Sequence, residues 1–412
     1  MNLFEVTDSD RKSQYRNMSE VLEACRIQDL SSSTNLKASR IRSLLNAYRL
    51  SKAYEPDSKV AYVVEQFPNE LVYALGMIPW NIESMAILLA QHGCADSFIN
   101  LTQQNNVSRD ICSFLRGSLG VIMANCYPNP DIVLANDQPC DCLSKLANIT
   151  SKNYRSPFFS ISTPTELNED TLDYLAGQQR RLMKDMAAAL NMEFNEADLD
   201  RTVGHSNEAR EYYCKTLELL RDYRLPGVAR EMLEIFGMNA FGIPENVQLC
   251  KTLYQEALEM SKKPENKRSG KRVLWAGQAP DGSHEIMQYV EKEVEVIFWA
   301  PLWNSNMMKL DPDDPYRSIA QRAIEYHWHM ERFQANLAEV CDTYGIDGIV
   351  ISNAWGCRNM LALSPMLREV CGEKKIKYLT INVDFMDRNN YAFNHVKNRI
   401  DAFLEILKQS HL

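Results

Sequence analysis

The sequence has no apolar run long enough to cross a membrane and no excess of basic charge. Its 412 residues carry a formal net charge of -9, with 45 Lys and Arg against 54 Asp and Glu. A transmembrane helix needs about 20 consecutive apolar residues, and an acidic balance argues against nucleic acid or an anionic membrane as the main partner. Residues 1–8 also lack the basic and apolar segments of a signal peptide. We therefore expect a cytoplasmic protein with no nucleic-acid partner and no membrane partner.

The pattern of a disulfide-stapled domain is missing as well. The eleven cysteines are an odd number without compact spacing, and cytoplasmic cysteines stay reduced, so we interpret them as thiols or metal ligands. A Walker-type loop is also missing. Residues 277–283 follow a strand candidate but lack the Lys-Ser/Thr pair of a nucleotide site. We interpret them as a strand-to-helix turn with Ser283 as a possible N-cap.

Short apolar runs that alternate with helical stretches are present in two parts of the chain. They cover residues 60–64, 131–135 and 157–162, and then 273–276, 294–299, 348–352 and 378–382. Such alternation predicts α/β layers with parallel strands. An amphipathic basic stretch over 36–49 precedes the first part, and a Met- and Leu-rich segment of helical period separates the two parts.

We therefore predict an α/β fold with two flavodoxin-like or Rossmann-like lobes that contain parallel sheets, plus an N-terminal helical arm and a helical insert. The predicted boundaries are 1–56 for the arm, 57–165 for the first α/β domain, 166–268 for the insert and 269–412 for the second α/β domain. We interpret the arm as a docking element.

Three cysteines occupy positions that suit iron-sulfur ligands. Cys112 stands at the head of a helix-like stretch, and Cys140 and Cys357 follow strand candidates. Open α/β sheets place their sites at the carboxyl ends of strands, so thiolates from distant parts of the chain can converge on one crevice. Three ligands would leave one iron of a cubane free to bind substrate.

Other candidates are weighed against structural roles. Cys126 and Cys142 lie near the predicted ligands in the sequence. They could bind a second cubane, but we favour the interpretation that they are buried structural thiols. His327 and His329 resemble a metal pair, but a spacing of two residues on a helix sends the rings to opposing faces, so we assign them to packing. The remaining cysteines are interpreted as core or partly exposed thiols; they are Cys25, Cys94, Cys214, Cys250, Cys341 and Cys371.

Several segments, in order along the chain, resemble the 2-hydroxyacyl-CoA dehydratase family, which includes the ATP-dependent benzoyl-CoA reductase subunits and the double-cubane-cluster proteins. The similar segments are residues 67–79, 111–116 with Cys112, 127–134 leading to Cys140, 271–277, 345–350 followed by Cys357, and 383–405. The spacing from 127–131 to Cys140 is most similar to that of the larger, catalytic-cluster subunit of the heterodimeric dehydratases.

The resemblance implies a 4Fe-4S cluster on Cys112, Cys140 and Cys357, as cofactor and metal site, and a lyase activity. Water would leave a 2-hydroxyacyl-CoA through a ketyl radical after ATP-dependent one-electron activation. The implied partners are the acyl-CoA substrate, a related second subunit in a heterodimer or a second copy in a homodimer, and an ATP-hydrolysing iron-sulfur activator protein. Two alternatives stay open: an ATP-dependent reductase subunit of the benzoyl-CoA reductase or double-cubane type, and a cluster protein that only relays electrons.

Two carboxylates lie nearest the substrate side that the resemblance implies, Glu65 and Glu83. Either can act as a base or as a gatekeeper for the leaving hydroxyl, although a solvated or capping role is the simpler interpretation. Glu65 stands where family members often have a small residue, and the aromatic stretch 298–303 differs from the acidic pattern of the smaller subunits. The acyl group therefore stays open. The basic run 262–272 could meet coenzyme A phosphates, but we favour a solvated linker.

Overall fold

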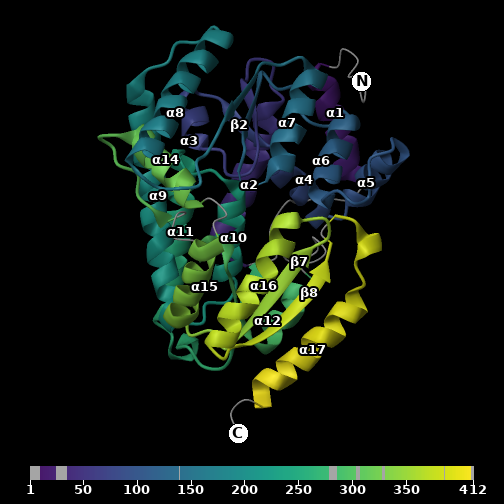
Figure 1. Ribbon diagram of the computed structural model, residues 1–412, viewed down its shortest axis with the longest axis vertical. Helices are drawn as coiled ribbons and strands as arrows, with labels where there is room; N and C mark the ends of the chain where they lie inside the picture. The colour runs from purple at the N-terminus through teal and green to yellow at the C-terminus, as the bar shows by residue number, and fades with distance from the viewer. Residues whose placement is uncertain are drawn as a thin grey trace.

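The structure is a computed structural model that describes residues 10–24, 35–138, 140–277, 285–302, 307–326, 330–384 and 386–409. Two four-stranded parallel sheets lie between layers of helices, with a group of long helices beside them (Figure 1). The predicted fold class, α/β with two lobes that contain parallel sheets, is confirmed. No helix of the described residues is long and apolar enough to span a bilayer. Four residues interpreted from the sequence lie outside the described part: Cys25, Ser283, His327 and His329.

The first sheet alternates its side chains between two hydrophobic clusters. Its strands, in the order β2-β1-β3-β4, are β1 Val60–Val63, β2 Ile78–Asn81, β3 Ile132–Asn136 and β4 Phe158–Ile161. Val60 and Tyr62 belong to one cluster, and Ala61 and Val63 to the other. Both faces are thus buried, as is typical of parallel strands covered by helices.

Helices from the same part of the chain cover the two faces of this sheet. The Tyr62 face packs against α4 Ile82–Gln91, α5 Ala95–Gln104, α6 Ser113–Met123 and α7 Asp141–Tyr154. The Ala61 face packs against α3 Asn69–Ala74 and α8 Glu169–Ala189. The edge strand β2 was not among the predicted strands. It contains Pro79, and proline, which cannot donate to a neighbouring strand, is confined to sheet edges and strand starts.

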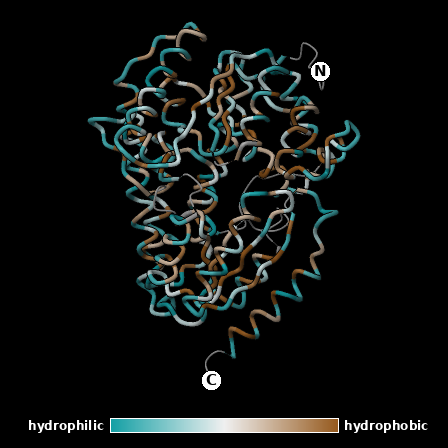
Figure 2. Tube along the Cα trace, in the orientation of Figure 1, coloured by the Kyte–Doolittle hydropathy of each residue, from teal (hydrophilic) through white to brown (hydrophobic). Residues whose placement is uncertain are grey.

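The second sheet repeats the plan in the order β6-β5-β7-β8. Its strands are β5 Arg272–Gly277, β6 Glu295–Phe298, β7 Gly348–Ala354 and β8 Lys377–Val383. The Trp275 face packs against α12 Glu285–Glu293 and α17 Phe393–Gln409. The Leu274 face packs against α15 Met330–Tyr344 and α16 Arg358–Glu373. Hydrophobic residues gather along the inner segments of both lobes (Figure 2).

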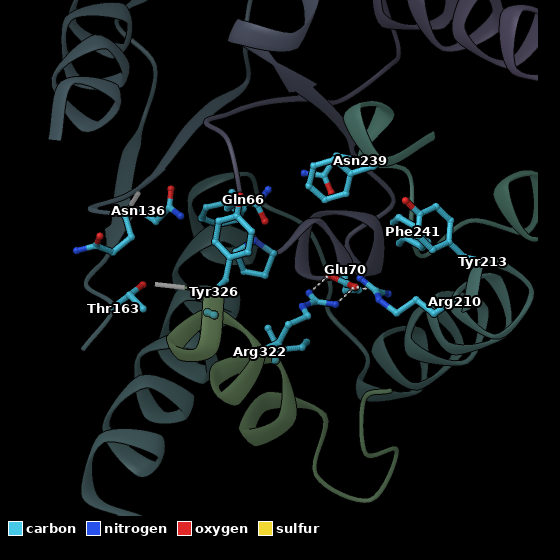
Figure 3. Close-up of a pocket in the computed structure, with 16 residues that line it drawn as sticks. Gln66, Glu70, Asn136, Thr163, Arg210, Tyr213, Asn239, Phe241, Arg322 and Tyr326 are labelled. Atoms are coloured by element: carbon cyan, nitrogen blue, oxygen red, sulfur yellow. Dashed lines mark hydrogen bonds and ion pairs between the residues drawn. The ribbon is translucent and has the colours of Figure 1, made fainter. Parts of the chain in front are cut away.

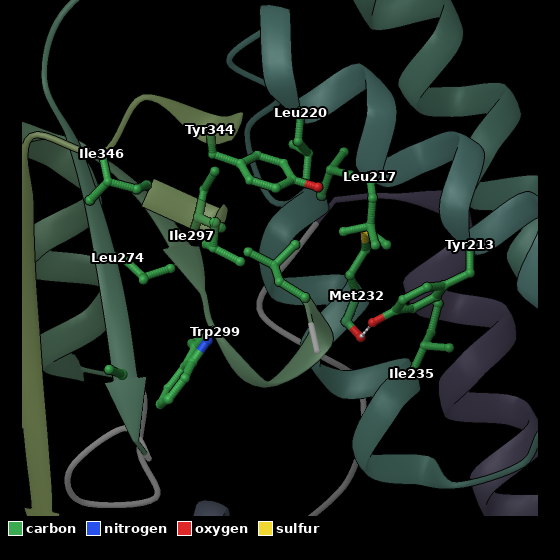
Figure 4. Close-up of a cluster of buried hydrophobic side chains, with 14 of the residues drawn as sticks. Tyr213, Leu217, Leu220, Met232, Ile235, Leu274, Ile297, Trp299, Tyr344 and Ile346 are labelled. Carbon is green, nitrogen blue, oxygen red and sulfur yellow. Dashed lines mark hydrogen bonds between the residues drawn. The ribbon is translucent and has the colours of Figure 1, made fainter. Parts of the chain in front are cut away.

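The remaining long helices connect the two lobes. They are α9 Glu196–Asp222, α10 Val228–Met238, α11 Pro244–Ser261 and α14 Pro315–Tyr326, and the short 3-10 helices are η1 Pro264–Asn266, η2 Ala300–Leu302 and η3 Arg388–Asn390. Residues of α9 and α10 share one cluster with Leu274 and Ile297 of the second sheet (Figure 4). Helix α14 instead packs on α8 beside the first sheet, although it follows β6 in the chain.

The N-terminal helices dock on the chain's own surface. In α1, Arg11–Ala24, the Arg11 guanidinium forms an ion pair with Asp131 at 2.6 Å. In α2, Lys37–Ala53, the nearly buried Arg42 pairs with the fully buried Glu231 of α10 at 2.7 Å. The predicted arm is therefore helical, and its docking surface lies within the same protein.

Candidate functional site

Each sheet has a topological switch point at the carboxyl ends of its strands. In the first sheet the chain runs from the central strand β1 to β2 on one side, and from the central strand β3 to β4 on the other side. In the second sheet it runs in the same way from β5 to β6 and from β7 to β8. Such reversals leave a crevice in which open α/β sheets bind ligands. Glu65 follows β1, Cys140 follows β3 and Cys357 follows β7. The strand ends thus bring these predicted residues to the switch points.

The three predicted ligand cysteines occupy the N-cap positions of helices. Cys112 precedes α6, Cys140 precedes α7 and Cys357 precedes α16. A helix N-terminus presents unpaired backbone N–H groups and the positive end of the helix dipole, which favours a negatively charged sulfur. All three are half-buried free thiols. Each sulfur interacts with backbone N–H groups in the first turn of its helix, which favours the negatively charged form that binds a metal.

The structure brings these cysteines together from opposite lobes. Gly356 has φ +75°, and a β-carbon at this position would lie 2.8 Å from the backbone nitrogen of Cys112. Only glycine permits such an approach at this backbone angle. Glu83, at the start of α4, interacts electrostatically with Cys112, Cys140 and Cys357. The three thiols therefore share one carboxyl neighbour.

Burial raises the pKa of all three thiols. It raises the pKa of Cys140 to about 12, against the opposing effect of the backbone N–H of Cys142. For Cys112, burial and then the neighbouring Cys357 raise the pKa, while two backbone N–H groups of α6 lower it. Burial also raises the pKa of Cys357. Such thiols stay neutral at pH 7 unless a metal replaces the proton.

The donor set consists of thiols, which are the usual ligands of iron-sulfur clusters. Within the described residues, no group of three or more His, Cys, Asp or Glu side chains could hold one metal ion. In a cubane each thiolate binds a different iron, so the ligands stand further apart than they do around one ion. Iron-sulfur clusters are held by Cys thiolates. Three free thiols on helix N-termini, from both lobes, meet that requirement.

Glu65 and Glu83 form a buried carboxyl pair. The backbone N–H of Glu65 donates to Oε2 of Glu83 at 3.3 Å, and the amides of Asn81 and Gln66 donate to Glu65 at 3.0 and 2.8 Å. Burial and then the charge of Glu65 raise the pKa of Glu83 to about 8. Burial also raises the pKa of Glu65, against the two amide hydrogen bonds. Burial thus favours the protonated form of both carboxyls, and two amide hydrogen bonds oppose this effect at Glu65.

A small cavity of about 50 Å³ lies beside this pair (Figure 3). Gln66, which donates a hydrogen bond to Glu65, and Tyr326 of α14 both line it. Burial and then the charges of Glu65 and Glu83 raise the pKa of Tyr326. Gln66 has φ +63°, a left-handed conformation that is uncommon outside glycine. Such backbone strain clusters at functional sites.

A buried ion-pair network forms another wall of the cavity, and the sequence patterns gave no indication of it. Both terminal nitrogens of Arg322 donate hydrogen bonds to the carboxylate of Glu70, each at 2.7 Å. Nη1 of Arg210 lies 3.4 Å from Oε1 of the same carboxylate. Burial raises the pKa of Glu70, but the two arginines and Ser206 outweigh it and lower the value to about 2. In the sequence, the one sign that pointed to Glu70 was its place in segment 67–79, which resembles the dehydratase family.

A second unpredicted ion pair joins the lobes next to Cys112. Arg116 of α6 pairs with Asp387, in the segment after β8, at 2.9 Å, and both side chains are almost fully buried. Met386 packs so tightly on Gly117 that a β-carbon there would lie 2.1 Å from its methyl group. These contacts hold the helix that follows Cys112 against the lobe that carries Cys357.

The other cysteines take several places. Cys126 is buried in the first-lobe cluster, as favoured, whereas Cys142 is half-buried and interacts electrostatically with Cys140 and Cys357. Cys94 is disulfide-bonded, contrary to the expectation of reduced thiols. Cys250, Cys341 and Cys371 are buried free thiols, and Cys214 is a half-buried one.

The basic run 262–272 is not a fully solvated linker. Its last residue, Arg272, is fully buried at the start of β5 and pairs with Glu295 at 2.8 Å. Lys271 pairs with Asp347 at 3.1 Å. The sequence could not show this because both acidic partners are distant along the chain. At its C-terminal end the run therefore anchors the second sheet.

Comparison with known proteins agrees with these features. The family model described as 2-hydroxyglutaryl-CoA dehydratase, D-component, matches residues 65–407. A similar curated protein is the (R)-phenyllactyl-CoA dehydratase alpha subunit of Clostridium sporogenes, which is 22% identical over 261 residues. That match covers 60% of this chain and 64% of the relative, so it spans just under two thirds of the relative's length.

Proposed function

Because the chain belongs to the 2-hydroxyglutaryl-CoA dehydratase D-component family, we propose that it is the iron-sulfur subunit of a 2-hydroxyacyl-CoA dehydratase. It removes water from a 2-hydroxyacyl-CoA by a ketyl-radical route after ATP-dependent one-electron activation. The observation that carries the proposal is the convergence of Cys112, Cys140 and Cys357, each at a helix N-terminus, around Glu83.

The three cysteines are the residues that would hold a 4Fe-4S cluster. The positive ends of three helix dipoles stabilise the negative charge of the thiolates, and the partly buried setting limits access of water and oxygen. One-electron transfer is the chemistry that such a bound cluster supplies. The tight contact of Gly356 with Cys112 keeps the ligands of the two lobes in one place.

Glu65 and Glu83 divide the proton transfers of the elimination. The hydroxyl can leave only as water, so its oxygen must receive a proton, and the neighbouring carbon must lose one. Glu83, with its raised pKa, holds a proton to give. Glu65, which accepts hydrogen bonds from two amides, is the base. Environments that push two carboxyl pKa values apart are how acid and base roles are assigned at neutral pH.

The partners follow from the reaction and from the relative. The relative is named as an alpha subunit, and we infer that this chain also works with a related second subunit or with a second copy of itself. An ATP-hydrolysing iron-sulfur activator supplies the electron. The acyl-CoA substrate lies in the crevice between the two switch points.

Iron content tests the cluster. Anaerobically reconstituted Cys112→Ser, Cys140→Ser and Cys357→Ser proteins should each lose most of their iron and their broad absorbance near 400 nm. Cys214→Ala, a half-buried thiol on α9, is the matched control and should keep the wild-type content. Full iron retention in Cys357→Ser would remove the assignment.

Product formed per electron tests the reaction. With activator, ATP, magnesium and a strong reductant, a dehydratase recycles its electron, so one electron should support many turnovers. One product for every two electrons would contradict the dehydratase and would favour the alternative, a benzoyl-CoA reductase or double-cubane type of subunit. Glu83→Gln should slow turnover at least 100-fold, the usual order for a positioned acid or base, while leaving iron content unchanged.

A further inference from the structure

A fourth free thiol lies beside the three predicted ligands. Cys142 is the second residue of α7, the helix whose N-cap is Cys140. Cys112, Cys140 and Cys142 all pack, partly buried, against the hydrophobic cluster of the first lobe, whereas Cys126 is buried inside that cluster. Cys142 therefore shares the margin of the lobe with two of the predicted ligands, and it is not a core thiol.

The start of α7 brings the Cys142 sulfur towards these ligands. The backbone N–H of Cys142 donates to the sulfur of Cys140, so the two residues are in contact within the first turn of the helix. Side chains on a helix lean towards its N-terminus, which here is the end that carries Cys140. Cys142 also interacts electrostatically with Cys357 of the opposite lobe. Its thiol therefore lies near predicted ligands from both lobes.

Cys142 completes the set of thiols that a cubane needs. Each iron of a 4Fe-4S cluster takes its own terminal ligand, and cubanes are normally held by four Cys thiolates. Among the described residues, Cys142 joins Cys112, Cys140 and Cys357 in one group of thiols that interact with one another across the two lobes. The positive end of the α7 dipole favours negative charge on Cys142 as well as on Cys140.

We propose that Cys142 is a fourth thiolate ligand of the cluster and binds the iron that the three N-cap thiols leave free. This inference rests on the proposed function. When the bond between sulfur and iron forms, the thiol loses its proton to solvent. When an acyl-CoA takes this position, Cys142 leaves with the bonding electron pair and takes a proton up again. Cys142 therefore keeps the iron closed until the substrate binds.

Cys142 and the three N-cap cysteines have different parts in this arrangement. Backbone N–H groups in the first turns of three separate helices hold the sulfurs of Cys112, Cys140 and Cys357 in place. These three therefore retain the cluster, and loss of any one of them releases iron. Cys142 is the ligand that exchanges with substrate, so it adds little to the retention of iron.

Mössbauer spectroscopy of the full-length protein, reconstituted anaerobically with iron-57, tests the ligand without catalysis. In the wild type, all irons should have the spectrum of iron bound by sulfur alone. Cys142→Ala should keep the wild-type iron content, but one iron of each cubane should take the spectrum of iron with a non-sulfur ligand. Cys214→Ala, which removes another half-buried thiol, is the matched control and should keep the wild-type spectrum.

Alkylation by iodoacetamide, followed by mass spectrometry of each cysteine, tests whether the ligand exchanges. Cys142 should react at least about ten times more slowly in the iron-loaded protein than in the apoprotein, because a thiolate bound to iron is no longer a free nucleophile. Cys214 is the internal control and should react equally in both. Saturating butyryl-CoA, which lacks the leaving hydroxyl, should restore the apoprotein rate at Cys142.

Each contrary outcome has a defined meaning. An iron with a non-sulfur ligand in the wild type, or equal alkylation of Cys142 with and without iron, would overturn the inference and leave the proposed function intact. Loss of about half of the iron in Cys142→Ala would assign this thiol to a second cluster and would also overturn it. Protection of Cys142 that persists in saturating butyryl-CoA would keep the fourth ligand but contradict the proposed function, because no iron would open to substrate.

Discussion

Replacing Arg116 with methionine should destabilise the protein severely, because it removes one member of a buried ion pair. Arg116 is fully buried and its partner Asp387 is 3% exposed, with 2.9 Å between Nη1 and Oδ2. Methionine keeps the apolar stem but leaves the carboxylate of Asp387 buried, with Asn389 as its one remaining hydrogen-bond donor among the described residues. Removing one member of a buried pair costs about 3–5 kcal/mol, because the remaining charge is uncompensated. We expect a loss of that size in the free energy of unfolding.

Urea denaturation followed by tryptophan fluorescence measures this loss, with Lys374→Met as the matched control. Lys374 pairs with Asp342 at 2.8 Å, but the Asp342 side chain is 74% exposed. An exposed pair contributes about 0–1 kcal/mol. The double variant Arg116→Met with Asp387→Asn should regain part of the stability, since it buries no unpaired charge. Equal small losses in Arg116→Met and Lys374→Met would refute the reasoning.

Three further predictions concern stability and ligand geometry. The pKa of Glu70 lies near 2 instead of the usual 4.5. Its ionised form therefore contributes about 3 kcal/mol to the free energy of unfolding above pH 4.5, and this contribution is lost as the pH falls towards 2. The difference in unfolding free energy between wild type and Glu70→Gln should shrink over that range, and a constant difference would contradict the prediction. Gly120→Ala should destabilise by about 1–3 kcal/mol in urea denaturation, because its β-carbon would lie 2.3 Å from the backbone oxygen of Phe98. In α9, a β-carbon added at Gly204 would meet none of the described residues within 4 Å, so Gly204→Ala should instead stabilise by up to about 1 kcal/mol. Gly356→Ala should lower the iron content of anaerobically reconstituted protein, and wild-type iron would show that this close approach is not needed.

The architecture could be predicted from the sequence because parallel strands leave a strong local pattern. Residues 348–352 are almost entirely apolar, and they form the core of β7, which is buried on both faces. The strand over 78–81 was missed because Pro79 weakens the local signal, and only its pairing with β1 makes it a strand. The packing of helix α14 on α8 of the other lobe depends on tertiary contacts.

At the site, the sequence by itself determined that the three cysteines stand at strand ends and helix starts, because strand ends and helix starts are local features. It also indicated Glu65 and Glu83 by their place beside the similar segments. The tertiary structure decided how these groups meet: Gly356 lies against Cys112, and Glu83 lies near all three thiols. It also decided that Glu70 pairs with an arginine 252 positions away. No local pattern distinguishes one arginine from another over such a separation, because burial and partner choice arise only when distant surfaces pack together.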